Sequence, residues 1–265
     1  KTSVRMSAAQ LYEIIFDGNN KWMLSANGTI FTYEYEAIIP GLLKRWYAER
    51  QEMQKKMREC GDNEIEREYW DKRQLVKKIN LNSLYGAILN PGCRFFDIRI
   101  GQSVTLTGRC ITKHMASKVN EIVAGKYDHK GESVVYGDTD SVYFSAYKTL
   151  QKEINEGVIP WTKDSVVALY DRIADEVNGS FKSFMTKAFH TPSTRGEVIA
   201  AGRELVASKG LFITKKRYAV LYYDKEGKRA DVDGKDGKMK AMGLDLKRSD
   251  TPVFVQDFLS DLLYM

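Results

Sequence analysis

Asp138 and Asp140 lie two residues apart in the segment 136–141, which has the sequence YGDTDS and is flanked by the apolar residues 134–135 and 142–144. Two β-prone runs joined through a Gly-Asp turn predict a hairpin. Extended chain repeats every two residues, so both carboxylates can lie on the same side of its tip. Carboxylate oxygens suit Mg²⁺, and paired acidic residues hold the ions that stabilise attacking and leaving oxygens in phosphoryl and nucleotidyl transfer. The alternative is an ordinary solvated turn, because Asp and Gly favour turns for backbone reasons alone.

A second set of polar residues lies upstream, in the helical pattern of residues 77–86. At about 100° per residue, Lys78, Asn82 and Tyr85 fall within roughly 60° of arc on one face. A lysine offers a point charge for a triphosphate, and a tyrosine ring offers a flat surface on which a base can stack. Gly86 leaves space where another backbone or a base comes close. The alternative for any one of these residues alone is a place on an ordinary surface helix.

Together the two sets resemble motifs of the family B DNA polymerases, of the T-even bacteriophage type. Motif B of that family, KxxxNSxYG, matches residues 78–86, and motif C, YGDTDS, matches residues 136–141. A third family element, KKRY, is present at residues 215–218, and all three follow the family order. The similarity runs from residues 38–40 to residues 249–252. Three ordered motifs are far more specific than any one of them alone.

The resemblance implies roles in metal and nucleotide binding. Asp140 is expected to be the more direct ligand of two Mg²⁺ ions in the complete enzyme, with Asp138 supporting it. Lys78 and Arg50 are expected to neutralise the charge of the incoming triphosphate. The pocket for the nascent base pair is then shaped by three residues of motif B, namely Asn82, Tyr85 and Gly86.

Arg50 matches the first of the basic residues that the family carries on its first fingers helix. One turn later the T-even relatives have a lysine, whereas this chain has Gln54, and Lys55 and Lys56 point elsewhere on an α-helix. Whether the triphosphate is held less firmly is left open by the sequence. The alternative for Arg50 is a solvated surface charge.

For the KKRY segment the resemblance implies contacts to the primer-template duplex near the primer terminus. Along a single strand, Lys216 and Tyr218 would share one face, and Lys215 and Arg217 the other. The alternative is a solvated edge strand, because lysines protect exposed sheet edges. Glu197 aligns approximately with a further family carboxylate near the metals, and an ordinary strand glutamate is an equal alternative.

The amino-acid composition is consistent with these expectations but is less specific than the motifs. The 265 residues are 43% hydrophobic and 29% charged, which predicts a globular, soluble chain, and the net charge of +6 suits a polyanionic partner. Three cysteines without CxxC spacing indicate reduced thiols and neither a disulfide framework nor a zinc site. No apolar run approaches the ~20 residues of a membrane span, and nothing resembles a signal peptide. We therefore expect no membrane partner and a location in the cytoplasm of the host cell.

Periodicity and turn residues predict an α+β fold. Helices are expected over residues 8–16, 41–58, 66–89, 103–124 and 164–190, and from residue 252 onward. Strands are expected over residues 22–24, 29–35, 197–201 and 212–223, with the motif C hairpin between helices, a second hairpin at 224–229 and an exposed loop at 231–238. The resemblance implies a polymerase palm with an antiparallel sheet and flanking helices, plus two-helix antiparallel fingers. Its expected parts are an N-terminal palm piece at 1–39, fingers at 40–90, palm with motif C and KKRY at 91–248, and the start of a truncated thumb at 249–265.

One family motif does not occur in the sequence. Motif A, DxxSLYPS, supplies a further metal-binding Asp in the family, and no such string is present. We therefore expect an incomplete reading frame, an expressed fragment or a piece of a split polymerase that lacks the exonuclease domain and most of the thumb.

The expected function is template-directed nucleotidyl transfer from a dNTP to a primer 3′-hydroxyl by a two-metal mechanism, with no activity of this chain alone. Its expected partners are primer-template DNA, dNTP, the missing N-terminal part and thumb, and a sliding clamp. The alternative is a non-catalytic nucleic-acid-binding module of the same fold.

Overall fold

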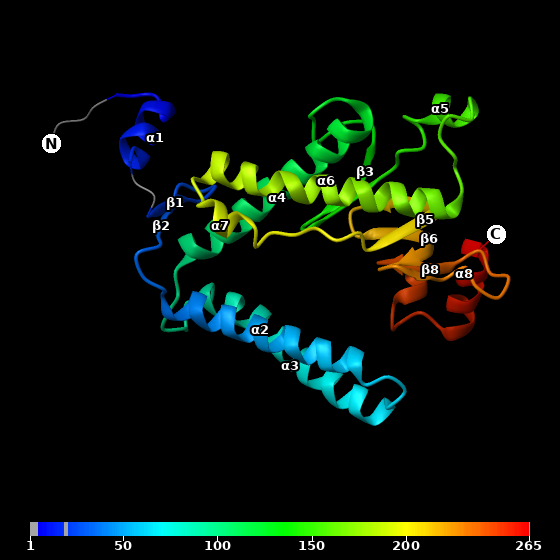
Figure 1. Cartoon of the computed structure of the whole chain (residues 1–265). Helices are drawn as coiled ribbons and strands as arrows, with labels where there is room; N and C mark the ends of the chain where they lie inside the picture. The colour runs from blue at the N-terminus through cyan, green and yellow to red at the C-terminus, as the bar shows by residue number, and fades with distance from the viewer. Residues whose placement is uncertain (1–4, 19–20, 265) are drawn as a thin grey trace. The chain divides into compact units, whose positions relative to one another are not determined.

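The computed structural model describes residues 5–18 and 21–264, in which helices alternate with small antiparallel sheets (Figure 1). The fold class is therefore α+β, as the sequence predicts. The α-helices are α1 (Ala8–Phe16), α2 (Ile38–Glu59), α3 (Glu64–Ile88), α4 (Ile98–Ala124), α5 (Gln151–Asn155), α6 (Lys163–Phe189), α7 (Ser193–Gly196) and α8 (Val253–Tyr264). The strands are β1 (Trp22–Leu24), β2 (Ile30–Thr32), β3 (Val134–Asp138), β4 (Ser141–Phe144), β5 (Leu205–Thr214), β6 (Arg217–Lys225), β7 (Lys228–Arg229) and β8 (Lys238–Met242).

The chain forms two compact units. Unit 1 comprises the residues up to 107 together with 189–191, and unit 2 comprises residues 108–188 and 192–265. The boundary falls within α4, so the two units share that helix. The division into palm, fingers and thumb stays a prediction.

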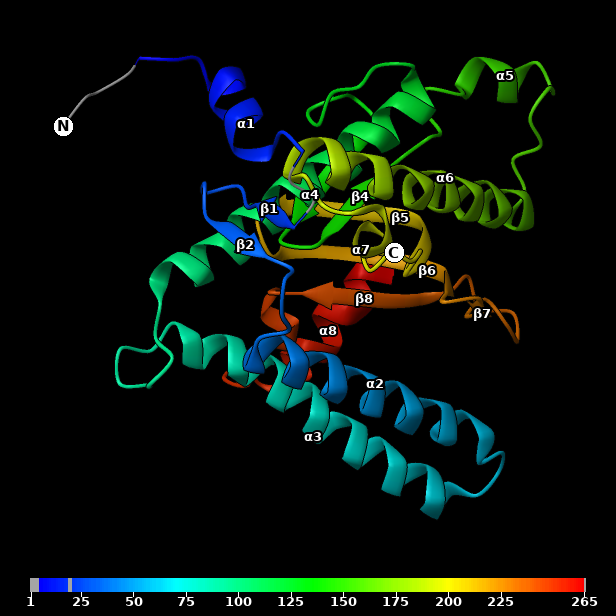
Figure 2. The same cartoon turned by 60° about the vertical axis from the view of Figure 1, so that its left-hand side comes forward.

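Unit 1 is dominated by the antiparallel helices α2 and α3, which lie side by side in both views (Figures 1 and 2). The side chain of Asn63 accepts a hydrogen bond from the amide of Glu66 and so begins α3. Ser7 begins α1 through a capping box with Gln10. In the β1–β2 hairpin, Trp22 lies opposite Thr32, as the turn at residues 27–28 predicts.

Unit 2 is built around two long helices and one sheet. Val119 and Val123 of α4 pack against Ile173, Val177 and Phe181 of α6 in the main core cluster. The sheet has β6 at its centre, paired antiparallel with β5 on one side and with β7 and β8 on the other (Figure 2). Val166 of α6 also packs against Val206 of β5 and Tyr223 of β6 in a second cluster, so α6 contacts both the main core and the sheet.

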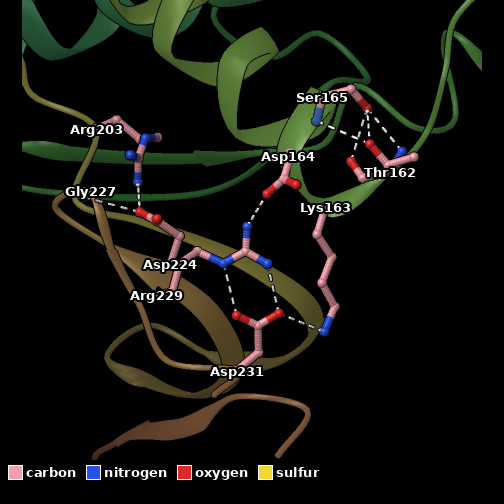
Figure 3. A network of polar contacts seen from close by, with 9 residues as sticks. All are labelled: Thr162, Lys163, Asp164, Ser165, Arg203, Asp224, Gly227, Arg229 and Asp231. Carbon is pink, nitrogen blue, oxygen red and sulfur yellow. Dashed lines mark hydrogen bonds and ion pairs between the residues drawn. The ribbon is translucent and has the colours of Figure 1, made fainter. Parts of the chain in front are cut away.

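An ion cluster around the largely buried side chains of Arg203 and Asp224 connects α6 to the sheet. Figure 3 shows the bonds of Asp224 to Arg203 and Gly227. Arg203 Nε lies 2.5 Å from Asp171 Oδ1 of α6, and its Nη1 lies 2.5 Å from Asp224 Oδ1 of β6. The Asp224 side chain is only 3% exposed, and the same oxygen accepts a hydrogen bond from the amide of Gly227. Burial alone would lower the pKa of Arg203, but its hydrogen bonds to the two aspartates raise it, so the guanidinium stays charged.

His114 of α4 is a buried polar residue in this unit. Its Nδ1 lies 2.7 Å from the hydroxyl of Tyr127 and its Nε2 lies 2.9 Å from the hydroxyl of Ser180, while its ring stacks on Phe184. Burial lowers the pKa of His114, and the positive charge of Lys118 lowers it further. The histidine therefore favours the neutral form in the folded chain.

Two strand predictions are wrong. Residues 197–201 follow the short helix α7 as a turn and irregular chain, because both backbone groups of Ala201 bond to the side chain of Asn178 on α6, at 2.7 and 2.8 Å. Residues 212–223 are not one strand, since the chain reverses at Lys215 and Lys216 between β5 and β6. Among the described helices, none has both the length and the apolar character needed to cross a lipid bilayer.

Candidate active site

The motif C residues form the predicted hairpin, but its turn lies two residues further along the chain than expected. Asp138 ends β3 and pairs with Ser141, the first residue of β4, so the two turn residues are Thr139 and Asp140 rather than Gly137 and Asp138. Gly137 instead pairs with Val142 inside the ladder, because a two-residue turn suffices to reverse the chain there. Asp138 is half-buried at the end of its strand, and Asp140 is exposed.

The turn is tightly wound around Thr139. This residue has φ +48°, which is rare for a β-branched side chain, and the amide of Asp140 donates to the carbonyl of Asp138 over 2.6 Å. Ser141 Oγ also donates to that carbonyl, over 3.2 Å. Asp140 is one of the residues that line a cavity of about 570 Å³ in unit 2.

An aromatic cluster packs the motif C hairpin against the β5–β6 hairpin. The rings of Tyr136 and Tyr143 lie opposite each other across β3 and β4, and each lies 5.3–5.5 Å from the rings of Phe212 and Tyr218. The hydroxyls of Tyr143 and Tyr218 are 3.0 Å apart. Burial raises the pKa of Tyr143, and its bond to Tyr218 raises it further. The hydroxyl of Tyr143 therefore stays neutral at ordinary pH.

The KKRY residues do not alternate along a single strand, which corrects the prediction made for them. Lys215 and Lys216 form the turn of the β5–β6 hairpin, and Lys216 has φ +62°. Arg217 begins β6, where its Nε donates to the carbonyl of Gly243 over 3.2 Å. The lysines and the arginine are exposed, whereas Tyr218 is buried in the aromatic cluster. Three cations, but not the tyrosine, are thus presented to solvent.

The two motifs of unit 2 are in direct contact. The backbone amide of Lys216 donates to the hydroxyl of Tyr136 over 2.8 Å. Tyr136 lies two residues before Asp138 on the same strand. The acidic turn and the basic turn therefore belong to one packed body, although 75 residues separate Tyr143 from Tyr218 in the sequence.

The motif B residues lie on α3 in unit 1. Lys78 and Asn82 are exposed, and Tyr85 is half-buried with its hydroxyl donating to the carbonyl of Gly101 over 3.1 Å. Gly101 lies so close to the end of α3 that a side chain there would overlap Leu89. A Cβ at Gly86, in contrast, would meet nothing within 4 Å. Packing among the described residues therefore does not require a glycine at position 86. That a base comes close to Gly86 stays a prediction.

The basic residues of the helix pair differ in how they are held. Arg50 Nε donates to Gln74 Oε1 across the two helices over 3.2 Å. Lys77 pairs with Glu49 at 2.5 Å, and this hydrogen bond lowers the pKa of Glu49. The side chain of Lys78 is exposed and makes no hydrogen bond or ion pair within the part of the chain that the structure describes. Its ammonium group can therefore accept an anionic ligand without giving up a bond seen there.

The expected carboxylate at Glu197 is engaged elsewhere. Its Oε1 lies 2.6 Å from the Nζ of Lys182 on α6, in an exposed ion pair. Glu197 follows α7 in a turn and not in a strand. We therefore leave it out of the proposed metal site.

The donor chemistry at motif C fits a hard divalent cation, since both side chains are carboxylates. Asp138 and Asp140 alone are few ligands for such an ion. Among residues 5–18 and 21–264, no group of three or more His, Cys, Asp or Glu side chains is arranged to hold a metal. A divalent ion at motif C would thus need ligands beyond these two carboxylates.

Comparison with known proteins decides the family. The model of DNA polymerase family B matches residues 6–186, which include motifs B and C. The chain belongs to DNA polymerase family B. It is 33% identical over 201 residues to the DNA-directed DNA polymerase of Escherichia phage RB69 and 30% identical over 201 residues to that of Enterobacteria phage T4, covering 72% and 71% of this chain. It is also 29% identical over 231 residues, 86% of this chain, to the DNA polymerase delta catalytic subunit of Oryza sativa subsp. japonica.

These family B relatives are much longer proteins. The matches span 22%, 21% and 18% of the RB69, T4 and rice proteins. The KKRY residues lie beyond the part that the family model matches.

Sequence reasoning missed several residues that shape this site. Tyr136 and Tyr143 could have been paired from the hairpin register, because they are equidistant from its centre. Thr112 of α4, whose hydroxyl binds the carbonyl of Thr139 over 2.8 Å, carries no local signal. The periodicity of α4 predicts which face of the helix carries Thr112, but it does not predict which residues that face contacts.

Proposed function

We propose that this chain supplies the fingers and the palm of a phage replicative DNA polymerase. The observation that supports this best is the contact between its motif C and KKRY hairpins, which joins two carboxylates and three exposed cations in one packed body. In this proposal residues 40–90 are the fingers, residues 1–39 and 91–248 are palm, and residues 249–265 begin the thumb. The reaction is template-directed transfer of a nucleotide from dNTP to a primer 3′-hydroxyl.

In the proposed reaction the 3′-oxygen of the primer bonds to the α-phosphorus of the dNTP as the bond to the β-phosphate oxygen breaks. Pyrophosphate leaves, and the hydroxyl proton passes to solvent. Asp140 and Asp138 would hold two Mg²⁺ ions together with a further carboxylate of motif A. When bound, these ions stabilise the attacking and leaving oxygens.

The other residues position the substrates. The Lys78 side chain is exposed and makes no hydrogen bond or ion pair with the other described residues, so its charge is free for the triphosphate. Tyr85 is oriented by its hydroxyl bond to Gly101, which fixes a ring face for the nascent base pair. Asn82 and Gly86 complete this pocket in the proposal. Arg50, which is bound to Gln74, would have to exchange that bond for a phosphate.

The three cations of the KKRY turn would hold the primer-template duplex by its phosphates. Such contacts position DNA without reading its sequence. Further partners in the proposal are the remainder of a longer polymerase and a sliding clamp, and its setting is the cytoplasm of the host cell. Because motif A is absent from the sequence, we propose that the 265 residues by themselves do not extend a primer.

The test uses a polymerase chain that extends this sequence upstream to include motif A. Asp140→Asn keeps the side-chain shape but removes the negative charge, so primer extension should fall by on the order of 10²- to 10³-fold or more. Primer-template affinity and the melting temperature should stay at wild-type values. Asp236→Asn is the matched control, because Asp236 is an exposed loop residue of the same unit.

Near-normal turnover of Asp140→Asn, or loss of activity with a lowered melting temperature, would remove Asp140 from the metal site. If the extended wild-type chain binds duplex DNA but adds no nucleotide, the non-catalytic binding module is the better assignment. Robust extension by the 265 residues alone would overturn the proposal that they need motif A.

A further inference from the structure

The turn between the two carboxylates holds an unfavourable backbone conformation. Thr139 lies in the left-handed region at φ +48°, which is a strained conformation for a β-branched residue. Such a conformation persists only where the surroundings hold it. The direction of both flanking side chains depends on it, since Asp138 and Asp140 are the neighbours of Thr139.

Closure of the hairpin supplies part of that support, because a two-residue turn needs a positive φ at one or both of its central residues, and the last ladder pair is Asp138 with Ser141. Among the described residues, the hydroxyl of Thr139 bonds to Asp138 of the same turn, over 3.2 Å. Within the described residues of the turn, the carbonyl of Thr139 has no bond, so only another element can fix it.

One side chain of α4 makes this contact. Thr112 Oγ1 lies 2.8 Å from the carbonyl oxygen of Thr139 and 3.1 Å from that of Gly108, one turn back on its own helix. Bonding to the residue four positions back is common for threonine in helices, but bonding to a turn 27 residues away is not. Within the described residues, this is the only hydrogen bond that ties Thr139 or Asp140 to another element.

We propose that Thr112 is a positioning residue for the motif C carboxylates. Its hydroxyl fixes the Thr139 carbonyl, and this keeps the left-handed turn and sets the relative directions of Asp138 and Asp140. The proposal rests on the proposed function, because it assigns those carboxylates to a divalent metal. Thr112 touches neither metal nor substrate and acts through the turn.

The test compares three variants of the 265-residue chain. Thr112→Val keeps the shape of the side chain and removes the hydroxyl, whereas Thr112→Ser keeps the hydroxyl. Thr105→Val is the matched control, because Thr105 lies on the same helix and bonds only to carbonyls of its own helix, those of Gly101 and Gln102. Far-ultraviolet circular dichroism and thermal melts establish that each variant is folded.

Two readouts report on the turn. The first is the NMR spectrum of the turn itself, in the exchange rate of the Asp140 amide and the intraresidue amide-to-Hα contact of Thr139 that marks a positive φ. The second is the dissociation constant of Mn²⁺, measured by paramagnetic broadening of the amides of residues 138–141. Thr112→Val should lose the positive-φ signature, exchange the Asp140 amide faster, and bind Mn²⁺ about 10-fold more weakly.

Thr112→Ser and Thr105→Val should keep wild-type values in both readouts. An unchanged turn in Thr112→Val would overturn the proposal, as would an altered turn with unchanged Mn²⁺ affinity. Because two carboxylates are few ligands, a wild-type chain that binds no Mn²⁺ at these residues is measured again in the form extended upstream to motif A. If that form also binds no Mn²⁺ at residues 138–141, the metal assignment of the proposed function fails and with it the metal consequence of Thr112. The conformational readout then still decides whether Thr112 holds the turn.

Discussion

Removing the cation of the buried ion cluster should destabilise unit 2 severely. Arg203 is the only cation bonded to Asp224 among the described residues, and the side chains are 10% and 3% exposed. Replacing Arg203 with Met leaves the Asp224 carboxylate buried with one backbone donor, the amide of Gly227. Breaking a buried pair in this way costs about 3–5 kcal/mol, and the remaining donor places the expected loss near the lower end, at about 3 kcal/mol.

The measurement is native-state hydrogen exchange of the β6 amides, because β6 lies at the centre of the sheet of unit 2. A loss of about 3 kcal/mol corresponds to exchange that is about 10²-fold faster. Lys182→Met is the matched control, because Lys182 forms an ion pair of 2.6 Å with Glu197 in which both side chains are more than half exposed. Its expected loss is below about 1 kcal/mol.

A second substitution separates the buried charge from the lost packing. In Arg203→Met with Asp224→Asn, the amide oxygen can still accept from Gly227, but no charge remains buried. The double variant should therefore be more stable than Arg203→Met alone. If Arg203→Met and Lys182→Met lose equal stability, burial does not control the strength of this cluster and the reasoning is refuted.

Three further predictions concern pH, helix stability and DNA. Burial lowers the pKa of His114, so as pH falls the unfolded chain takes up a proton on this residue before the folded chain does. The free energy of unfolding should therefore decline as pH falls below about 6.5. Urea unfolding measured between pH 7.5 and 5.5 should show a shallower decline in His114→Gln than in the wild type. Gly86→Ala adds a methyl group to open space within a helix and should raise the free energy of unfolding by about 0.5–1 kcal/mol. A lower free energy of unfolding would instead show that the methyl group clashes with a neighbouring group. Changing Lys215, Lys216 and Arg217 to Ala should flatten the slope of log affinity for duplex DNA against log salt by about 0.9 for each lost phosphate contact, and an unchanged slope would place the DNA surface elsewhere.

The helices and the hairpin of motif C could be predicted because their signals are local. Ser7 and Asn63 begin helices where their side chains cap them, and Val134 to Phe144 form two short strands around a tight turn. The i, i+4 spacing of Ile173, Val177 and Phe181 likewise places them on one face of α6, the face that packs into the core. In each case the residues that decide the structure lie within a few positions of one another.

The errors arose where the deciding contact is distant in sequence. Residues 197–201 have a strand-like composition, but the side chain of Asn178 binds the backbone of Ala201 and replaces any ladder. The turn at residues 215–216 contains neither Gly nor Asn, so nothing in its composition marks it. Its position follows from β5 and β6 pairing, in which Phe212 lies opposite Tyr218.

The candidate site shows the same division between residue types and their arrangement. The sequence identified Asp138, Asp140 and the KKRY cations by type and order, but it placed the KKRY residues on one strand with two faces. The structure instead presents Lys215 and Lys216 at a hairpin tip and turns Tyr218 inward. Tyr218 therefore packs between the two hairpins, and only the three exposed cations are available for the proposed contact to DNA.

This packing has a consequence for the proposed chemistry. The hydroxyl of Tyr136 accepts from the amide of Lys216, and the hydroxyl of Tyr143 bonds to that of Tyr218. Two polar contacts inside one aromatic cluster thus fix the basic turn relative to the acidic turn. If the basic turn holds primer phosphates, the offset between the primer end and the carboxylates is set by buried rings and not by flexible side chains. Positioning of reacting groups is a large part of catalysis in phosphoryl transfer, so rings that touch no substrate would still determine the rate.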